Sequence, residues 1–261
     1  MKGLMNHCGG RHTTRDELAK FTDPQPMSQT HVPIRHDYFV NEVENSLDAA
    51  GYKVVNEELS IQRFVNKKEG KLTQDNLFGI MEISNSDDHE DVGRIVGLRN
   101  SSTMQFRAQL GCGNRVFVCD NLSFSAEVVV GRRHTVHIKR DLPKLLAGAI
   151  ETLNKQFAEN ERRVEVYKDT SLSRIQVHDI VMLAMRYGAI PPSLLRPWVS
   201  LYYNPTHDEF KGKNLWALQN GFTEVAKRWP FATMQERTRS AIKVMDRVAS
   251  EIHGKNILNE S

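Results

Sequence analysis

Positive charge is concentrated in one stretch of this chain. Nine Lys and Arg residues lie between Val92 and Lys144 with only three acidic residues, which gives the stretch a net charge of +6. The whole chain carries +3, so the remainder sums to −3. A local excess of cations on a balanced protein is typical of a surface that binds a polyanion, although solvated charges on an open sheet face give the same pattern.

The spacing of these cations on predicted strands places several of them on shared faces. Side chains alternate between the two faces of a strand, so Arg115 shares a face with Phe117, and Arg133 shares one with His137 and Lys139. Arginine contacts phosphate and phenylalanine stacks on a base, a combination that suits single-stranded nucleic acid. The candidate nucleic-acid-binding residues are therefore Arg94, Arg99, Arg107, Arg115, Phe117, Arg132, Arg133, His137, Lys139 and Arg140.

Histidine and cysteine residues do not form a zinc-binding pattern. His134 and His137 lie three residues apart on a predicted strand, so their side chains point to opposite faces. The N-terminal set of His7, Cys8 and His12 has no second ligand pair at zinc spacing. We predict no metal site and no cofactor.

Catalytic motifs are also missing from the sequence. It contains no GxSxG, no glycine loop ending in Lys-Ser or Lys-Thr, no HExxH, and no GxGxxG after a predicted strand. The acidic cluster of Asp87, Asp88, Glu90 and Asp91 could hold a divalent cation, but an acidic surface loop is the simpler interpretation. We predict no catalytic residues.

The elements that position the cations form an α+β pattern in three predicted parts. Residues 1–36 are polar and broken by Gly and Pro, which predicts an extended arm with one short helix over Arg15–Phe21 that orders only against a neighbouring copy. Residues 37–169 form an antiparallel β-meander covered by helices, and residues 170–261 are helical. Within the middle part we expect a helix over 37–50 and strands over 52–65, 76–84, 92–99, 115–119 and 125–138.

Helical periodicity replaces the strand pattern after the last predicted strand. Asp141 can cap a helix whose apolar stripe continues from Leu142 to Phe157, about four turns. Capping boxes at Ser173 and Thr233 predict helix starts near 174 and 234. The C-terminal helices are expected over 174–187, 193–203, 214–228 and 234–253, with the aromatic side chains of this part in their core.

Composition restricts the class of protein. Of the 261 residues, 39% are hydrophobic and 26% are charged, as in ordinary globular domains. No apolar run is long enough to span a membrane and no secretory signal follows the first basic residue, so we expect a cytoplasmic protein. The three cysteines have no disulfide-like spacing, which favours reduced thiols.

Several motifs in order resemble the plasmid- and phage-encoded family of domains of unknown function that is numbered 932. The similarity covers roughly residues 30–245, and its motifs are Val96–Ser101, Asn114–Ser125, Arg133–Thr135, Asp141–Pro143, Leu215–Val225 and Arg237–Thr238. The resemblance implies a mobile element or bacteriophage, and therefore the cytoplasm of a bacterial host. It brings no catalytic residues. A meander followed by a long packing helix is also similar in outline to phage single-strand annealing proteins, an analogy of element order alone.

Three functions follow from these patterns as hypotheses. The leading one is a non-enzymatic phage or plasmid protein that binds nucleic acid, in particular single-stranded DNA for binding or annealing, and that forms a homo-oligomer. The first alternative is an anti-defence or host-takeover protein whose cations contact an acidic surface of a host protein. The second alternative is an enzyme that acts on nucleic acid.

Overall fold

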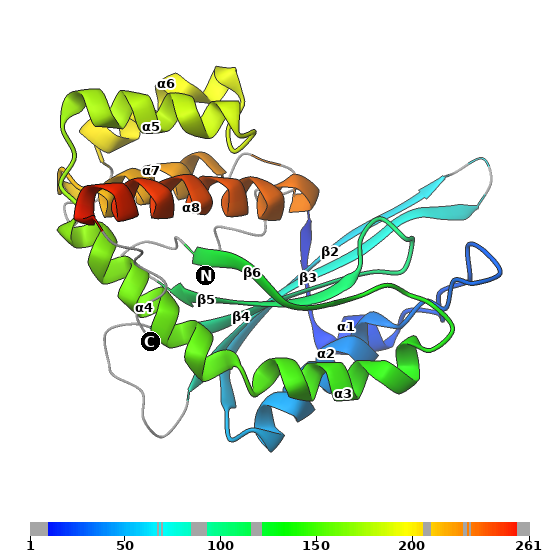
Figure 1. Cartoon of the computed structure of the whole chain (residues 1–261). Helices are drawn as coiled ribbons and strands as arrows, with labels where there is room; N and C mark the ends of the chain where they lie inside the picture. Colours follow the sequence, from blue (N-terminus) through cyan, green and yellow to red (C-terminus); the bar gives the residue numbers. More distant parts are fainter. Residues whose placement is uncertain are drawn as a thin grey trace. The chain divides into compact units, whose positions relative to one another are not determined.

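The fold is an antiparallel sheet followed by helices, which confirms the predicted α+β class (Figure 1). The computed structural model describes residues 10–66, 68, 70–84, 93–115, 122–205, 210–226, 229 and 231–254. Its contacts divide the chain into two units. Unit 1 comprises Met1–Cys112 and Val128–Asn154, and unit 2 comprises Gly113–Glu127 and Lys155–Ser261. The sequence predicted the start of the helical part near residue 170, whereas the division falls at 154–155.

The six strands follow one another in the sheet in chain order. Apolar residues occupy both faces of the central strand β3, so Leu77 and Phe78 are both buried. This burial explains why the stretch of β3 from Leu77 to Ile83 is nearly continuously apolar. The strands are β1 (Arg11–Thr13), β2 (Lys53–Asn66), β3 (Lys71–Ser84), β4 (Gly93–Ser101), β5 (Ala108–Arg115) and β6 (Leu122–Arg132).

The cross-strand register shows which residues share a face. Leu59 of β2 lies opposite Gly79 of β3, which lies opposite Leu98 of β4. A Cβ atom added to Gly79 would lie 2.8 Å from side-chain atoms of both leucines, so glycine permits their close packing. Asp75 of β3 and Asn100 of β4 are an even number of residues from Gly79 and Leu98, so their side chains lie on the same face of the sheet.

The described part of unit 1 also contains the helices α1 (Arg15–Ala19), α2 (His36–Ala49) and α3 (Ile138–Ile150). Helix α2 buries Phe39, Val43 and Leu47, which are spaced by four, and it contacts α3, β2 and β4. Gly51, at φ +85°, follows the end of α2 as the sequence predicted.

The short helix predicted over 15–21 is present as α1, whereas the described residues of the N-terminal segment are ordered within their own chain and not only against a neighbouring copy. Thr14 caps α1 by accepting a hydrogen bond from the backbone N–H of Glu17, and β1 pairs with β2 of the same chain. Leu18 and Ile34 are buried. These apolar anchors are too few to produce a periodic signal, but they hold the segment in the core of unit 1.

The single long helix predicted after Asp141 is two helices. Helix α3 ends at Ile150, and α4 spans Leu153–Asp169. Between them, the Thr152 hydroxyl donates to the backbone oxygen of Ala149 at 2.7 Å, a local bond that competes with continued helix. The apolar stripe crosses the break, which is why periodicity predicted one helix.

Unit 2 contains the remaining helices around an aromatic core. Trp198, Phe222 and Trp229 are buried and meet edge to face. The capping box at Ser173 is present, whereas Thr233 lies inside a helix that begins three residues earlier than predicted, at Phe231. The elements are α5 (Arg174–Arg186), a 3-10 turn (Pro192–Leu194), α6 (Leu195–Tyr203), α7 (Leu215–Ala226) and α8 (Phe231–His253). In the described part of the chain, no helix has the length and apolar character needed to cross a membrane.

Candidate nucleic-acid interface

The two candidate cations of β4 do not share a face. Arg94 and Arg99 are five residues apart in a strand whose pairing with β3 has no bulge, so their side chains lie on opposite faces. Arg99 is half-buried, donates to the side-chain oxygen of Gln109, and lies 4.8 Å from the centre of the Phe106 ring. The prediction of a single basic face on the sheet is therefore wrong for Arg94 and Arg99.

The candidates between β4 and β6 are distributed over different elements. Arg107 is exposed in the turn between β4 and β5. Arg115 ends β5, and the position of its side chain is outside the described part. Phe117 also lies outside the described residues, as does the acidic cluster at 87–91.

The last predicted strand ends six residues early, at Arg132. The backbone N–H of Ile138 donates to the oxygen of Thr135 at 2.8 Å, and α3 begins at Ile138. Ile138 and Leu142 are buried whereas Arg140 between them is exposed, a pattern that fits a helix and not a strand, because residues 138, 140 and 142 would share one face of a strand. Strand parity therefore does not apply to Arg133, and its predicted common strand face with His137 and Lys139 is wrong.

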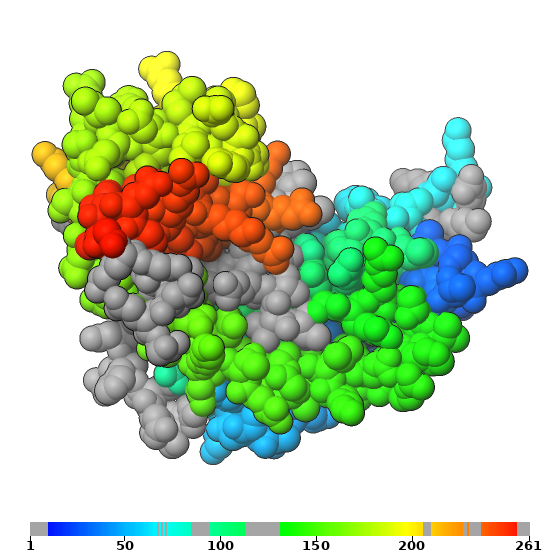
Figure 2. Space-filling view, viewed as in Figure 1, coloured from blue at the N-terminus to red at the C-terminus, as the bar shows by residue number. Residues whose placement is uncertain are grey.

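A different arrangement brings these residues together at the start of α3. Arg133 and His137 are exposed in the connection that precedes the helix, and Lys139, Arg140 and Lys144 are exposed on the helix itself. We call these five residues the α3 basic surface. The segment from 132 to 150 forms part of the molecular surface in Figure 2, in bright green.

One carboxylate partly compensates this charge. Asp141 accepts hydrogen bonds from Arg140 at 2.8 Å and from Arg132, which is half-buried, at 2.7 Å. The hydrogen bond from Arg140 lowers the pKa of the Asp141 carboxyl, and the charges of Arg132 and His137 lower it further. Within the described part of the chain, Arg133, Lys139 and Lys144 form no ion pair.

The backbone adds positive potential at the same place. His137 is the N-cap of α3, and its side chain makes no capping hydrogen bond. The first N–H groups of a helix carry a partial positive charge, which attracts anions and repels Lys and Arg. Cations in this first turn therefore oppose local stability and favour an anionic ligand.

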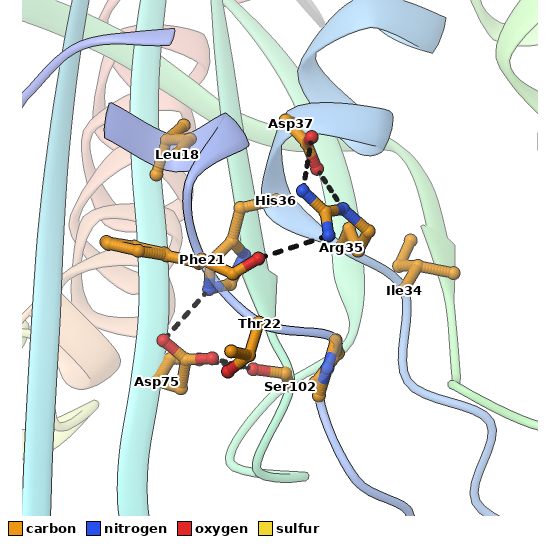
Figure 3. Close-up of a pocket in the computed structure, with 10 residues that line it drawn as sticks. Leu18, Phe21, Thr22, Ile34, Arg35, His36, Asp37, Asp75 and Ser102 are labelled. Carbon is orange, nitrogen blue, oxygen red and sulfur yellow. Dashed lines mark hydrogen bonds and ion pairs between the residues drawn. The ribbon is translucent and has the colours of Figure 1, made fainter. Parts of the chain in front are cut away.

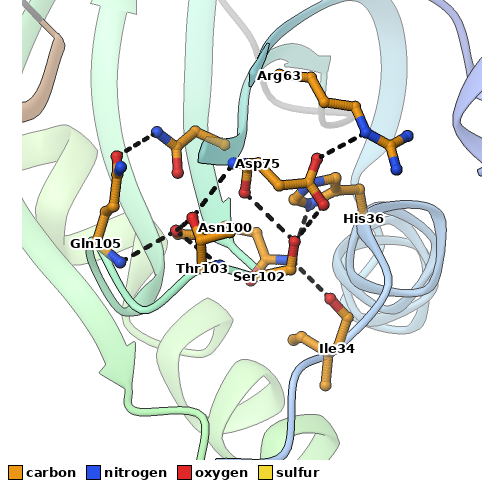
Figure 4. A network of polar contacts seen from close by, with 10 residues as sticks. Ile34, His36, Arg63, Asp75, Asn100, Ser102, Thr103 and Gln105 are labelled. Atoms are coloured by element: carbon orange, nitrogen blue, oxygen red, sulfur yellow. Dashed lines mark hydrogen bonds and ion pairs between the residues drawn. The ribbon is translucent and has the colours of Figure 1, made fainter. Parts of the chain in front are cut away.

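A buried polar network on β3 holds the turn between β4 and β5, which carries Arg107 (Figure 4). Ser102 donates its hydroxyl to the Asp75 carboxylate and its backbone N–H to the Asp75 backbone oxygen, the latter at 3.0 Å. The backbone N–H of Asp75 donates to the Thr103 hydroxyl at 3.2 Å. These bonds hold the β4–β5 turn on β3.

The same network reaches α2 through an ion pair. His36 Nε2 lies 3.3 Å from Asp75 Oδ1, a distance that fits an ion pair although the two atoms are not aligned for a hydrogen bond. Burial alone would raise the pKa of the Asp75 carboxyl, but the nearby His36, Ser102 and Arg63 lower it below its usual value. The Ser102 hydroxyl bonds to the carboxylate and not to the histidine, so this is not the arrangement of an activated nucleophile.

A pocket beside this ion pair is too small for an organic ligand. Figure 3 shows Phe21, Thr22 and Ser102 around it, with Arg35 held by Asp37 and by the backbone oxygen of Phe21. Its volume is about 10 Å³, which is the room one water molecule requires. Among the described residues, no group of three His, Cys, Asp or Glu side chains could hold a metal ion.

Sequence reasoning did not identify the network around Asp75. No motif in the sequence singles out His36, because its partner Asp75 lies 39 positions away on another element. The available signal was the polar run from Asn100 to Thr103, all four residues of which are buried directly after an apolar strand.

Comparisons with known proteins found no similarity. No family model, no curated protein and no solved structure matches this chain.

Proposed function

We propose that this protein binds nucleic acid, in particular single-stranded DNA, through the α3 basic surface, without catalysing a reaction. One observation carries the proposal: exposed, largely unpaired cations surround the uncapped start of α3. Each cation in the first turn of a helix costs about 0.3–1 kcal/mol of stability. A local feature that opposes stability is typical of a functional site, and a polyanion would relieve this repulsion.

The dimensions of the surface suit a phosphate backbone. Seven residues separate His137 from Lys144, which corresponds to about 10 Å along a helix. Neighbouring phosphates of an unpaired, extended strand lie farther apart than the axial rise of about 3.4 Å per nucleotide in a duplex, so about two of them fit this length. Arg140 and Lys144 are four residues apart and lie on one side of α3.

The chemistry favours contact with the backbone over reading of bases. The exposed side of α3 carries Lys and Arg without the Asn or Gln side chains that read adenine in a major groove. Val136, whose side chain is 64% exposed, offers an apolar contact beside the cations. An unpaired strand can place a base there, whereas a duplex keeps its bases stacked. We also propose that the protein is a homo-oligomer, which the analogy with annealing proteins supports.

Charge removal tests the proposal. We expect the variant Arg133→Ala/Lys139→Ala/Lys144→Ala to bind a fluorescent single-stranded oligonucleotide more weakly and with a flatter dependence on log salt. Three lost phosphate contacts should reduce the slope by about 2, at roughly 0.7 for each contact. Fluorescence anisotropy at several salt concentrations measures both quantities.

The matched control removes three other cations. Arg174, Arg196 and Lys243 are exposed on helices of unit 2, so replacing all three by Ala gives the same change in net charge. This variant should retain the wild-type slope. Equal loss in both variants would show that net charge alone acts and would reject the site. Wild-type protein that binds an acidic protein surface but no oligonucleotide would favour the host-protein alternative.

A further inference from the structure

Two buried histidines join segments that are distant in the sequence. His31 lies between α1 and α2, and His134 lies in the connection that carries the α3 basic surface. Their rings stack with 5.8 Å between centroids and 28° between planes. Their exposed fractions are 3% and 6%. Next to the stack, the backbone N–H of Val32 donates to the backbone oxygen of His134 at 3.1 Å. The connection before α3 is therefore attached to the 22–35 segment.

Three of the four ring nitrogens have no hydrogen-bond partner among the described residues. His31 Nδ1 accepts from the backbone N–H of Met27 at 3.0 Å, whereas His31 Nε2 and both ring nitrogens of His134 are buried and unpaired. The lone pairs of an imidazole lie in its ring plane, so two stacked rings do not converge on one metal ion. The geometry points to two neutral imidazoles packed together.

Three carboxylates on the neighbouring elements already have partners. Asp75 of β3 contacts His36 and Ser102, Asp37 of α2 is paired with Arg35, and Asp141 of α3 is paired with Arg132 and Arg140. The charges that act on His134 are those of His31 and His36, and Arg63 on β2 and Arg133 and His137 beside His134 are further charged or titratable groups on these elements. Arg35 is paired with Asp23 and Asp37. The surroundings therefore disfavour protonation of either stacked ring.

We propose that the His31–His134 stack is a proton-sensitive latch, which holds the connection before α3 in place at neutral pH and releases it in mild acid. The consequence for ligand binding rests on the proposed function, because the latch supports the α3 basic surface. The latch itself depends only on the two rings and their burial.

The direction of the pH effect follows from the burial. Burial, with the charges of His31 and His36, lowers the pKa of His134 to about 4, and burial also lowers the pKa of His31. An exposed imidazole titrates near 6.5, so below this pH the open form takes up protons that the closed form does not. Opening becomes about tenfold more favourable for each pH unit and each histidine, and for His134 this trend levels off near pH 4.

Hydrogen exchange of the full chain without nucleic acid tests the latch. After correction for the intrinsic exchange rate, the opening constant of peptides covering 27–36 and 131–138 should rise about 30-fold between pH 7.5 and pH 5.0 from His134 alone. His134→Phe retains a stacked aromatic ring without a titratable group, so its opening should lose most of this pH dependence. His31→Phe leaves the buried His134 in place, so it should retain most of the 30-fold rise and lose only the contribution of His31.

His178→Phe is the control, because His178 is exposed on α5, where its ring centroid lies 6.5 Å from that of Tyr203. It should retain the wild-type pH dependence. Wild-type opening that does not change between pH 7.5 and 5.0, or a rise in His134→Phe as large as that of the wild type, would overturn the latch. Oligonucleotide binding at pH 7.5 is measured separately, so a failure of the proposed function leaves the exchange result interpretable.

Discussion

Replacing Asp246 should destabilise unit 2 more than its single charge suggests. Asp246 of α8 accepts hydrogen bonds from Arg163 Nε at 3.0 Å and from the Tyr167 hydroxyl at 2.6 Å, both on α4. The side chains of Arg163 and Asp246 are 6% and 14% exposed. Burial, followed by the charge of Asp246, raises the pKa of Tyr167, so this hydroxyl remains a donor.

The magnitude follows from the charge left behind. Asp246→Leu removes the carboxylate that pairs with the buried Arg163 guanidinium, which keeps its hydrogen bond to the side-chain oxygen of Asn160 at 2.7 Å. Removing one member of a buried pair costs about 3–5 kcal/mol. Replacing both members, as Arg163→Met/Asp246→Leu, removes the uncompensated charge and should bring the free energy of unfolding back to within about 1–2 kcal/mol of wild type.

Urea unfolding followed by tryptophan fluorescence measures this difference in the full chain. All three tryptophans, Trp198, Trp216 and Trp229, lie in unit 2, so the signal reports that unit. The exposed pair of Arg247 and Glu251 on the same helix provides the control, and Glu251→Leu should cost less than about 0.5 kcal/mol. The reasoning is refuted if Asp246→Leu costs no more than the control, or if the double variant is less stable than Asp246→Leu alone.

Two further predictions concern packing and chemistry. Gly79→Ala should lower the free energy of unfolding by about 1–3 kcal/mol, because its Cβ would lie 2.8 Å from atoms of Leu59 and Leu98, and a chemical denaturation curve that matches wild type would contradict this packing. Incubation with single- and double-stranded DNA and RNA, with and without Mg²⁺ or Mn²⁺, should leave the substrates intact on denaturing gels. Cleavage that is lost on replacing Asp87 or Asp88 would instead support the enzyme alternative.

The location of the basic site depends on a distinction that local sequence does not make. The run from Thr135 to Lys139 alternates polar and apolar residues, which is typical of a strand. In the structure, Ile138 and Leu142 are buried in unit 1 while Arg140 is exposed, and a strand would place all three side chains on one face. The same cations then surround a helix start instead of lining one face of a sheet.

The separation of Arg94 and Arg99 on opposite faces was predictable from the sequence. Arg94 and Arg99 are five residues apart on one predicted strand, so parity alone places them on opposite faces. The partners of Arg99 were not predictable in the same way, because Gln109 and Phe106 reach it only when β4 and β5 pair.

The sequence by itself determined the α+β class, the meander and most of the helices, because the apolar periods of strands and helices are local properties. The start of α5 was equally local, since Ser173 and Gln176 satisfy each other's backbone groups within one turn. Only the tertiary structure decided where β6 ends and that His31 stacks on His134. These features depend on which apolar and polar groups meet in the core, and the two histidines are brought together by elements separated by about a hundred residues of chain.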